Sequence, residues 1–274
     1  MLARLAVAST MPSPYDLIGT TYARSRRADP AISRVLAQLL QLKPTGTYLD
    51  VGCGTGNYSL ALSALGGAWS AVDVSEVMLG QARSKTDAVA WVQADADCLP
   101  LADTSFDGAI CTLAIHHFDS LDAPFAEVRR TLRSGQSGAF VIFTGLAEQM
   151  CQYWLCHYFP QMMERSMAKM PTESAIRSAL SRAGFKAIAV APFFVTNGLE
   201  DLFLYAGKHR PALYLDAAVR ANISSFAQLA PPAELQEGLA RLTADIQSGA
   251  FAAIQARYAN GAGDYAFVTA WHGS

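Results

Sequence analysis

Residues 49–62 read LDVGCGTGNYSLAL: a short apolar run, a glycine-rich turn and the beginning of a helical pattern. This order of strand, turn and helix is typical of the first unit of an open α/β sheet, in which ligands lie beyond the carboxyl ends of the strands. Gly52, Gly54 and Gly56 let the backbone of the turn approach such a ligand closely. The stretch therefore predicts a site for a nucleotide-like cofactor.

The residues around these glycines separate the candidate cofactors. A dinucleotide-binding turn reads GxGxxG, and counted from Gly52 it needs a small residue at the position that holds Asn57. A phosphate-binding P-loop needs a lysine after the turn, and none follows. Asp50 stands two residues before the first glycine, where a carboxylate repels phosphate and favours a cationic ligand. The turn thus disfavours a nucleotide-linked oxidoreductase.

Apolar runs and helical patterns alternate along the chain. Strands are expected at residues 48–51, 69–73, 90–94, 106–114, 139–143, 186–195 and 264–271, and helices at about 30–42, 57–65, 75–84, 120–133, 150–170 and 172–184. Alternation of this length implies a parallel sheet with helices on both faces. We therefore predict an α/β fold with a doubly wound, seven-stranded, mostly parallel sheet.

The length of the chain fits one core with added helices rather than two independent domains. We expect residues 1–30 to form an N-terminal arm and helical lid. Residues 31–196 and 260–274 are expected to form the core, and residues 197–259 a helical insertion between strands six and seven. We treat all of these parts as a single domain.

The composition narrows the class of protein further. The net charge is −2 and only 16% of the 274 residues are charged, which gives no electrostatic basis for binding nucleic acid or an anionic membrane. No apolar run approaches the roughly eighteen residues of a transmembrane helix. The five scattered cysteines lack a CxxC pair, which argues against a disulfide framework and a structural zinc site. We expect a cytoplasmic protein without membrane insertion, nucleic acid or metal, and a homodimer stays open.

Four motifs follow one another in a characteristic order. They are LDVGCGTGNY (49–58), AVDVSEVML (71–79), ADADCLPLADTSFDGA (94–109), and LAIHHF (113–118) followed by RTLRSG (130–135). With these motifs the sequence resembles the class I S-adenosylmethionine-dependent methyltransferases, and among them the ubiquinone/menaquinone-biosynthesis-like branch that acts on small molecules. The resemblance covers about residues 15–145 and implies the Rossmann-like methyltransferase fold.

The resemblance also implies a cofactor, S-adenosyl-L-methionine, with S-adenosyl-L-homocysteine as its product. Asp50 and the glycines would contact the methionine part, Asp73 the ribose, and Asp95 with Ala96 the edge of the adenine. A tyrosine of the lid would close over the cofactor. The expected cofactor-binding residues are Tyr22, Asp50, Gly52, Cys53, Gly54, Gly56, Asp73, Val74, Asp95, Ala96 and Leu113.

Two adjacent histidines are the candidates for acid–base chemistry. Methyl transfer mainly requires that donor and acceptor are aligned and that water is excluded, so a base is needed only where the acceptor loses a proton. His116 and His117 follow the fourth strand, beside the expected methyl position, and a neutral imidazole there could accept a proton from a phenol, enol or activated carbon. The alternative is that one lines the cofactor pocket while the other packs against or caps the following helix.

Residues 150–170 are rich in aromatic side chains and methionine, which can wall an apolar acceptor pocket. The candidate substrate-binding residues are Tyr15, Tyr153, His157, Tyr158 and Arg210. The alternative places the aromatic side chains in the core and the arginine in a salt bridge or in solvent.

We predict a methyltransferase that transfers the methyl group of S-adenosylmethionine to carbon or oxygen of a small, apolar or aromatic molecule. One alternative is a non-catalytic protein that binds S-adenosylmethionine or S-adenosylhomocysteine. Another is a thiol or arsenite methyltransferase using Cys151 and Cys156, which is disfavoured because their spacing on a helix directs them to different faces.

Overall fold

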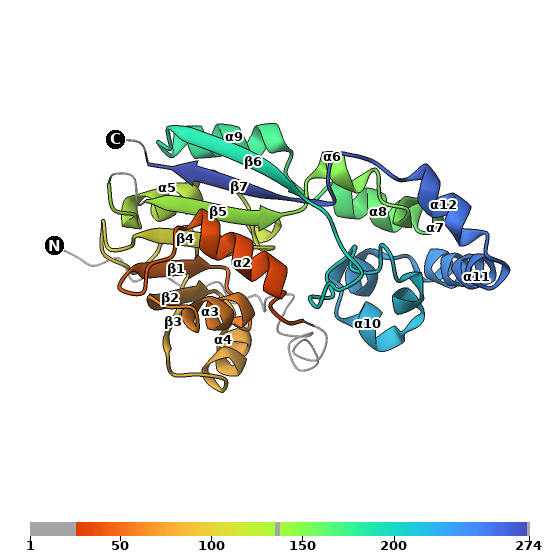
Figure 1. Cartoon of the computed structure of the whole chain (residues 1–274), viewed down its shortest axis with the longest axis horizontal. Helices are drawn as coiled ribbons and strands as arrows, with labels where there is room; N and C mark the ends of the chain where they lie inside the picture. Colours follow the sequence, from red (N-terminus) through yellow and green to blue (C-terminus); the bar gives the residue numbers. More distant parts are fainter. Residues whose placement is uncertain (1–25, 135–137, 273–274) are drawn as a thin grey trace.

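The computed structural model describes residues 26–134 and 138–272 (Figure 1). Within these residues the strands form one seven-stranded sheet in the order β3-β2-β1-β4-β5-β7-β6. The bounds are Thr47–Val51 for β1, Ala68–Asp73 for β2, Val89–Gln93 for β3, Gly108–Thr112 for β4, Ala139–Thr144 for β5, Ala187–Phe193 for β6 and Tyr265–Trp271 for β7. Strands β1 to β5 pair in parallel, whereas β7 runs antiparallel between β5 and β6. The predicted seven-stranded, mostly parallel sheet is confirmed. Of the lid predicted over residues 1–30, residues 1–25, with Tyr15 and Tyr22, lie outside the described residues.

Helices cover both faces of the sheet (Figure 1). Their bounds are Pro30–Leu39 for α2, Asn57–Ser63 for α3, Glu76–Arg83 for α4, Asp122–Thr131 for α5 and Glu173–Arg182 for α9. The apolar sides of α2 and α3 belong to one buried cluster, and those of α5 and α9 belong to another. Because helices cover both faces of the sheet, the inner strand β5 is buried along its whole length.

Helix α2 shows how the sequence defines a boundary. The carboxylate of Asp29 accepts hydrogen bonds from the backbone N–H groups of Ala31 and Ile32 at 2.9 and 3.1 Å, and Pro30 occupies the first helical position. A carboxylate cap satisfies N–H groups that have no partner inside the helix, and proline suits the first turn because it has no N–H group. The helical start predicted from these residues is confirmed.

A cluster of helices lies beyond the ends of β5 and β6, on the right in Figure 1. We call this cluster the cap. It consists of α6 (Ala147–Met150), α7 (Leu155–Tyr158), α8 (Pro160–Met167), η2 (Pro211–Leu215), α10 (Ala217–Ala221), η3 (Ser225–Leu229), α11 (Pro232–Ser248) and α12 (Phe251–Arg257). The ring of Trp154 packs edge-on against Tyr158, Tyr214 and Phe251, so aromatic side chains form much of the interior of the cap.

The single helix expected over residues 150–170 is instead divided into α6, α7 and α8. The division between α7 and α8 falls at Phe159, whose φ of −133° and ψ of 59° are not helical. Pro160 follows and begins α8, because proline disfavours helical geometry in the residue before it. The break lets the short helices fold around a common aromatic core. Among the described residues, the helices are all too short or too polar to cross a bilayer.

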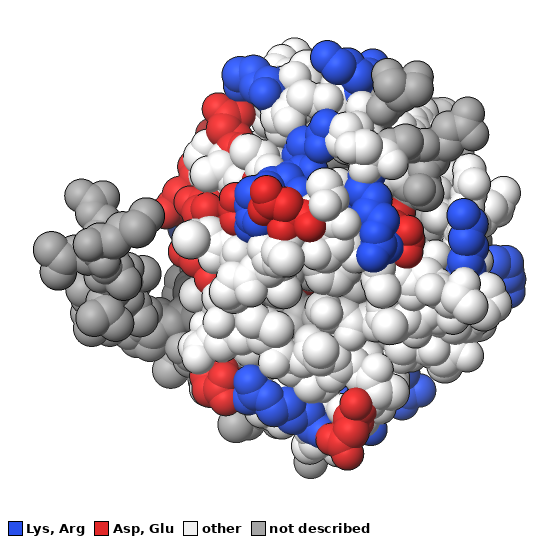
Figure 2. Space-filling model, turned by 90° about the vertical axis from the view of Figure 1, so that its left-hand side faces the viewer, with Lys and Arg blue, Asp and Glu red and all other residues white. Residues whose placement is uncertain are grey.

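The cap leaves and rejoins the sheet at neighbouring positions. Phe193, the last residue of β6, pairs with Tyr265, the first residue of β7. Thr144, the last residue of β5, pairs with Ala266. Both cap segments therefore connect to the sheet at the same end, where the parallel strands have their carboxyl ends. Figure 2 shows the opposite end of the molecule, where acidic and basic side chains are interspersed.

Candidate cofactor and active site

The glycine turn joins β1 to α3. Gly52, Gly54 and Gly56 all have left-handed backbone conformations, with φ values of 70°, 55° and 72°. A Cβ atom at Gly52 would lie 2.6 Å from Cβ of Ala114, and one at Gly56 would lie 2.2 Å from the ring of Trp91. Among the described residues, a Cβ atom at Gly54 would meet nothing within 4 Å. Two of the glycines are thus required by packing, whereas the middle one borders space that a ligand can occupy.

The carboxylate of Asp73, at the end of β2, helps to hold the turn in place. It accepts hydrogen bonds from the N–H groups of Gly54 at 2.7 Å and Ser75 at 2.9 Å. The N–H group of Cys53 donates to the carbonyl oxygen of Val72 at 3.0 Å. The turn is therefore fastened to the end of the neighbouring strand, and the half-buried Asp73 lies beside its middle glycine.

Asp50 is the most deeply buried acidic residue of the site, with only 1% of its surface exposed. Its Oδ2 atom accepts a hydrogen bond of 2.5 Å from the hydroxyl of Ser59, whereas its Oδ1 atom is buried without a partner in the described residues. Burial raises the pKa of Asp50 from its ordinary value of 3.8 to about 7, the Ser59 hydroxyl opposes this rise, and the negative charge of Asp73 adds to it. A cationic partner would therefore stabilise the ionised form of this carboxylate.

This arrangement fits S-adenosylmethionine. Its amino-acid end carries an ammonium group, which can donate to the unpartnered oxygen of Asp50. No described residue lies within 4 Å of a Cβ atom built at Gly54, so a ligand could approach the backbone of the turn there. Asp73 stands at the end of the next strand, where a carboxylate can accept hydrogen bonds from ribose hydroxyls. The site thus offers acceptors at the positions where this cofactor has donors.

Val74, another predicted cofactor-binding residue, follows β2, and the residues expected at the adenine, Asp95 and Ala96, follow β3. Strand β3 pairs with β2 as far as Asp73, so the carboxyl ends of the two strands are adjacent. Val74 is 59% exposed, Asp95 is exposed and Ala96 is half-buried. The Asp95 carboxylate accepts a hydrogen bond of 3.0 Å from the N–H group of Asp97, which fixes a local turn. The structure therefore places these residues in line with Asp73 along one edge of the sheet.

The end of β4 carries local strain and unpaired polar atoms. Leu113 has a φ of 54°, a conformation that is unfavourable for leucine, and its N–H group donates to the carbonyl of Phe143 at 2.7 Å. Within the described residues, the hydroxyl of Thr112 and the Nδ1 atom of His116 are buried without partners. Such strain and unpaired atoms concentrate at functional sites.

His116 and His117 lie together in the short helix η1 (Ile115–His117), with ring centroids 3.9 Å apart. Desolvation holds the pKa of His116 well below its usual range, and the neighbouring His117 lowers it further. Desolvation also lowers the pKa of His117 to about 4, with contributions from the positive charges of Lys169 and Arg26. Both imidazoles are therefore neutral at physiological pH and able to accept a hydrogen bond or a proton.

The predicted substrate residues of residues 150–170 lie within the cap. The Tyr153 ring is buried and stacks on Tyr205 at 3.8 Å, and its hydroxyl donates to the carbonyl of Asp264. Tyr158 is also buried, and its hydroxyl donates to Asp245 at 2.8 Å. Both tyrosine hydroxyls thus already have partners inside the cap.

His157 and Arg210, the remaining predicted substrate residues among those described, form contacts elsewhere in the cap and the loop that leads into it. His157 is half-buried and its Nε2 atom lies 3.0 Å from the guanidinium of Arg241. Arg210 donates to the carbonyl of Leu199 at 2.6 Å, and its Nε atom is buried without a partner in the described residues. Neither of these hydrogen bonds joins His157 or Arg210 to the glycine turn.

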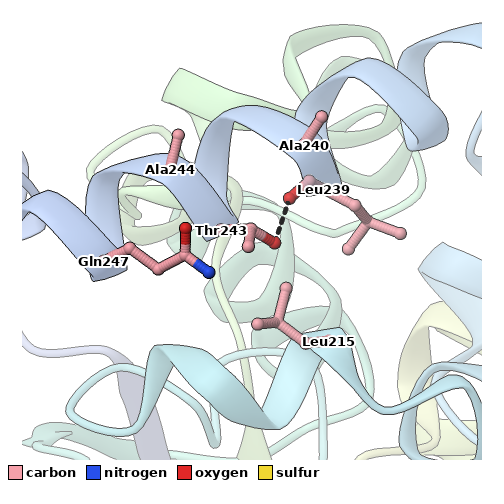
Figure 3. Close-up of a pocket in the computed structure, with 6 residues that line it drawn as sticks. All are labelled: Leu215, Leu239, Ala240, Thr243, Ala244 and Gln247. Carbon is pink, nitrogen blue, oxygen red and sulfur yellow. Dashed lines mark hydrogen bonds between the residues drawn. The ribbon is translucent and has the colours of Figure 1, made fainter.

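A groove opens on the cap between η2 and α11 (Figure 3). It has a volume of about 460 Å³ and is lined by Leu215, Leu239, Ala240, Thr243, Ala244 and Gln247. The hydroxyl of Thr243 donates to the carbonyl of Leu239 at 2.8 Å, so this hydroxyl is partly committed to its own helix. The groove belongs entirely to the cap.

Sequence reasoning missed several residues beside the turn. Lys85 donates to the carbonyl of Thr55 at 2.7 Å and to the side chain of Asn57 at 2.8 Å. Asn57 also donates to the carbonyl of Arg26 at 3.1 Å, and Arg26 forms an ion pair with Asp201. The only signal in the sequence was Asn57, whose amide both donates and accepts where other turns have glycine. The remaining contacts join distant segments that carry no motif.

Comparisons with known proteins agree with this geometry. Residues 49–142 match the family model described as a methyltransferase domain. A solved structure from Anabaena variabilis, described as a methyltransferase from an antibiotic biosynthesis pathway, is 35% identical and covers 90% of this chain and 98% of its own, with a TM-score of 0.80.

Two curated relatives are matched over smaller regions. The malonyl-acyl-carrier-protein O-methyltransferase of Pseudescherichia vulneris is 29% identical over 65% of this chain and 74% of its own length. The ubiquinone/menaquinone biosynthesis C-methyltransferase UbiE of Acidiphilium cryptum is 26% identical over 57% of this chain and 72% of its own length. Several other curated relatives are matched over only about half of their length. Taken with the sheet order and the Asp50 and glycine site, the near full-length match shows that the chain belongs to the class I S-adenosylmethionine-dependent methyltransferases.

Proposed function

We propose that the protein transfers the methyl group of S-adenosylmethionine to oxygen or carbon of a small, apolar or aromatic molecule. The observation that carries this proposal is the pair of neutral imidazoles, His116 and His117, at the end of β4. They lie one strand away from the acceptors of the cofactor site, because β4 pairs directly with β1. A proton acceptor beside the methyl donor suits a phenol, an enol or an activated carbon.

In the proposed reaction, S-adenosylmethionine supplies a methyl carbon that is already activated by a sulfonium. Asp50 would hold the ammonium group of this cofactor, and Asp73 would hold its ribose. The left-handed glycine turn would let the backbone approach the part of the cofactor that lies between these two groups. As the acceptor bonds to this methyl carbon, the carbon–sulfur bond would break and S-adenosylhomocysteine would leave, and His116 or His117 would accept the proton that the acceptor loses. The main contribution of the chain is alignment and exclusion of water.

The names of the relatives support both kinds of acceptor atom. One curated relative is an O-methyltransferase and another is a C-methyltransferase. The aromatic interior of the cap, which adjoins the carboxyl ends of the strands, supports an apolar or aromatic acceptor. Residues Tyr153, His157, Tyr158 and Arg210 stay predictions as acceptor contacts, as do Tyr15 and Tyr22 as lid residues. A cytoplasmic location and a homodimer also stay predictions.

A thiol or arsenite acceptor receives less support. Burial raises the pKa of Cys156 to about 11, which disfavours the thiolate that soft-metal chemistry needs. The thiol of Cys151 is exposed and donates to the carbonyl of Glu148 at 3.1 Å. Cys156 therefore does not present the low-pKa thiolate expected of such an enzyme, and the thiol of Cys151 already donates within its own segment.

Calorimetry followed by a transfer assay tests the proposal. S-adenosylmethionine and S-adenosylhomocysteine are titrated into the protein, with NAD as the control ligand. The purified protein is then incubated with methyl-labelled S-adenosylmethionine and a panel of phenols, enols, quinols, carboxylic acids, thiols and arsenite. We expect binding of both sulfur ligands, no binding of NAD, and label in a phenol, enol or quinol. Binding without transfer to any acceptor would instead support the non-catalytic alternative, and transfer only to thiols or arsenite would overturn the choice of acceptor.

A further inference from the structure

The first three residues of α3 each connect to a different part of the molecule. The amide of Asn57 donates to the carbonyl of Arg26 at 3.1 Å. The hydroxyl of Tyr58 donates to the carboxylate of Asp201 at 3.1 Å, and the hydroxyl of Ser59 donates to Asp50 at 2.5 Å. One helical turn thus joins the segment before α2, the loop that leads into the cap, and the carboxylate that faces the cofactor.

Asp201 is the centre of this junction. It lies in the loop after β6 and is 1% exposed. Its carboxylate accepts hydrogen bonds from Nε of Arg26 at 2.5 Å, from Nη2 of Arg26 at 3.2 Å and from the Tyr58 hydroxyl. A buried carboxylate needs such partners, because an unpaired charge away from water is very unfavourable. Asp201 therefore stays in this position only while Arg26 and Tyr58 stay in theirs.

A second set of bonds surrounds the same junction. Asp29, the N-cap residue of α2, accepts a hydrogen bond of 2.9 Å from the N–H group of Glu200. The N–H group of Asp29 lies 3.5 Å from the hydroxyl oxygen of Tyr58, which can accept from it. Figure 1 shows the beginning of α2 beside the loop that descends from β6. The loop after β6, which contains Glu200 and Asp201 and leads into the cap, is thus fixed to the core at the side of the sheet where the glycine turn lies. We call it the cap loop.

We propose that Asp201 is a positioning residue that couples cofactor binding to the placement of the cap. A cofactor ammonium that engages Asp50 also fixes Ser59 and hence the first turn of α3. The adjacent Tyr58 is then held against Asp201, and the cap loop is held with it. Because coupling between two sites is reciprocal, a correctly placed cap must in turn strengthen cofactor binding. This inference goes beyond the proposed function, since it applies whichever acceptor is methylated.

Another buried carboxylate in the chain provides a matched control. Asp264 is also 1% exposed, and it accepts hydrogen bonds from Lys208 at 2.8 Å and from the N–H group of Val195 at 2.7 Å. The exposed fractions of the two cations are nearly equal, 15% for Arg26 and 16% for Lys208. Asp264 has no hydrogen bond to α3 among the described residues. The replacements Asp201→Asn and Asp264→Asn therefore remove equivalent charges, and only the first breaks the junction.

The test measures the affinity for S-adenosylhomocysteine by calorimetry in both variants and in the unaltered protein. We expect the Kd to rise at least about fivefold in Asp201→Asn, as typical coupling energies imply, and to stay unchanged in Asp264→Asn, although both variants lose thermal stability. Hydrogen exchange supplies the second readout. The ligand should protect the backbone amides of residues 199–206 in the unaltered protein and in Asp264→Asn, and this protection should be lost in Asp201→Asn.

If Asp201→Asn does not fold, Tyr58→Phe takes its place, because it removes a single hydroxyl and preserves the packed ring. Its expected results are the same weakening of binding and the same loss of protection. Its matched control is Tyr48→Phe, since the buried Tyr48 hydroxyl accepts from the N–H group of Lys43 at 2.7 Å, away from residues 199–206. An unchanged Kd in Asp201→Asn or Tyr58→Phe would overturn the inference. So would equal weakening in the variant and its control, because that result would show general destabilisation rather than coupling.

Discussion

Ser59 and Asp50 form a hydrogen bond of 2.5 Å that divides the carboxylate into two unlike oxygen atoms. The oxygen that accepts from Ser59 is committed to the fold. The other oxygen is buried without a partner in the described residues and lies beside the glycine turn. The helix that follows the turn thus orients the carboxylate so that one oxygen remains for a cationic ligand.

Asp50→Asn is expected to change stability in a pH-dependent way. The native pKa of about 7 exceeds the ordinary value of 3.8, so the native protein holds a proton that the unfolded chain releases between these values. The contribution of Asp50 to the free energy of unfolding therefore decreases as the pH rises from about 4 to 7, by about 4 kcal/mol at most. Denaturation at pH 5 and pH 8 should show that Asp50→Asn gains stability relative to the unaltered protein at the higher pH.

The same replacement should weaken binding of S-adenosylhomocysteine at pH 8 by about 1.5–3 kcal/mol, because a hydrogen bond to a charged group is lost. Calorimetry at the same pH measures this change. A variant that gains no stability at pH 8 would show that Asp50 is already ionised at little cost. A variant that binds the ligand normally would show that the free oxygen does not face the ammonium group.

Gly54→Ala and Gly249→Ala form a matched pair. Both glycines have left-handed φ values, 55° and 81°, and a Cβ atom would meet no described residue at either position. Each replacement should lower the free energy of unfolding by about 1 kcal/mol because of the backbone conformation. Only Gly54→Ala should weaken binding of S-adenosylhomocysteine, by tenfold or more, since its methyl group enters the space above the turn. Equal affinities of the two variants would place the ligand elsewhere.

Asp73→Ala should weaken cofactor binding by about 1–3 kcal/mol, because hydrogen bonds to a carboxylate are lost. The same change removes the acceptor of the Gly54 N–H group, so a loss of affinity alone has two explanations. A deoxyribose analogue of S-adenosylhomocysteine separates them in calorimetric titrations. It should bind less tightly than the parent compound to the unaltered protein and equally tightly to Asp73→Ala. A penalty that persists in the variant contradicts the ribose assignment.

The two histidines should make the protein acid-sensitive. An unfolded histidine takes up a proton near pH 6.5, whereas His117 in the native protein resists protonation until about pH 4 and His116 resists it further. The free energy of unfolding should therefore decrease as the pH falls from about 6.5 to 4. Replacing both residues by asparagine should flatten this part of the stability profile, as denaturation curves at several pH values would show. An unchanged slope would mean that the imidazoles are solvated in the native state.

Catalysis gives a separate test of the same pair. His116 and His117 are each replaced singly by asparagine. The variant that lacks the proton acceptor should have a kcat about 100-fold lower, with little change in affinity for S-adenosylhomocysteine. Because both imidazoles are already neutral, kcat should not increase between pH 6.5 and 8 through their titration. Parallel losses of turnover and cofactor affinity would indicate that the histidine only supports the pocket.

The regular part of the fold could be predicted because its signals are local. Asp29 and Pro30 mark the beginning of α2, and the alternation of apolar runs marks the strands, since each signal lies within a few residues of the structure that it specifies. The division of residues 150–170 at Phe159 was not predicted, although Pro160 marks it. Strand β4 is shorter than expected because Leu113 turns into a left-handed conformation.

The candidate site divides in the same way. Asp50, Asp73 and the glycines share motifs of short range, so the sequence indicated the cofactor. The contact between Arg26 and Asp201 joins residues 175 positions apart, and no periodicity or spacing reports such a pair. The unpartnered nitrogen of His116 likewise depends on which groups surround it in three dimensions. Features that arise from packing between distant segments were therefore beyond sequence reasoning.

The pairing of Phe193 with Tyr265 has a consequence for how this enzyme can diversify. The long excursion from β6 to β7 begins and ends at one paired position of the ladder, so topologically it is an enlarged hairpin loop. Such a loop can lengthen, shorten or be exchanged with little change to the sheet, because its ends remain where they were. Thr144 pairs with Ala266 one position further along β7, so the segment that follows β5 leaves the sheet at the same end. The sheet that carries the glycine turn and Asp50 can therefore keep its geometry while the loop between β6 and β7 changes in length or sequence.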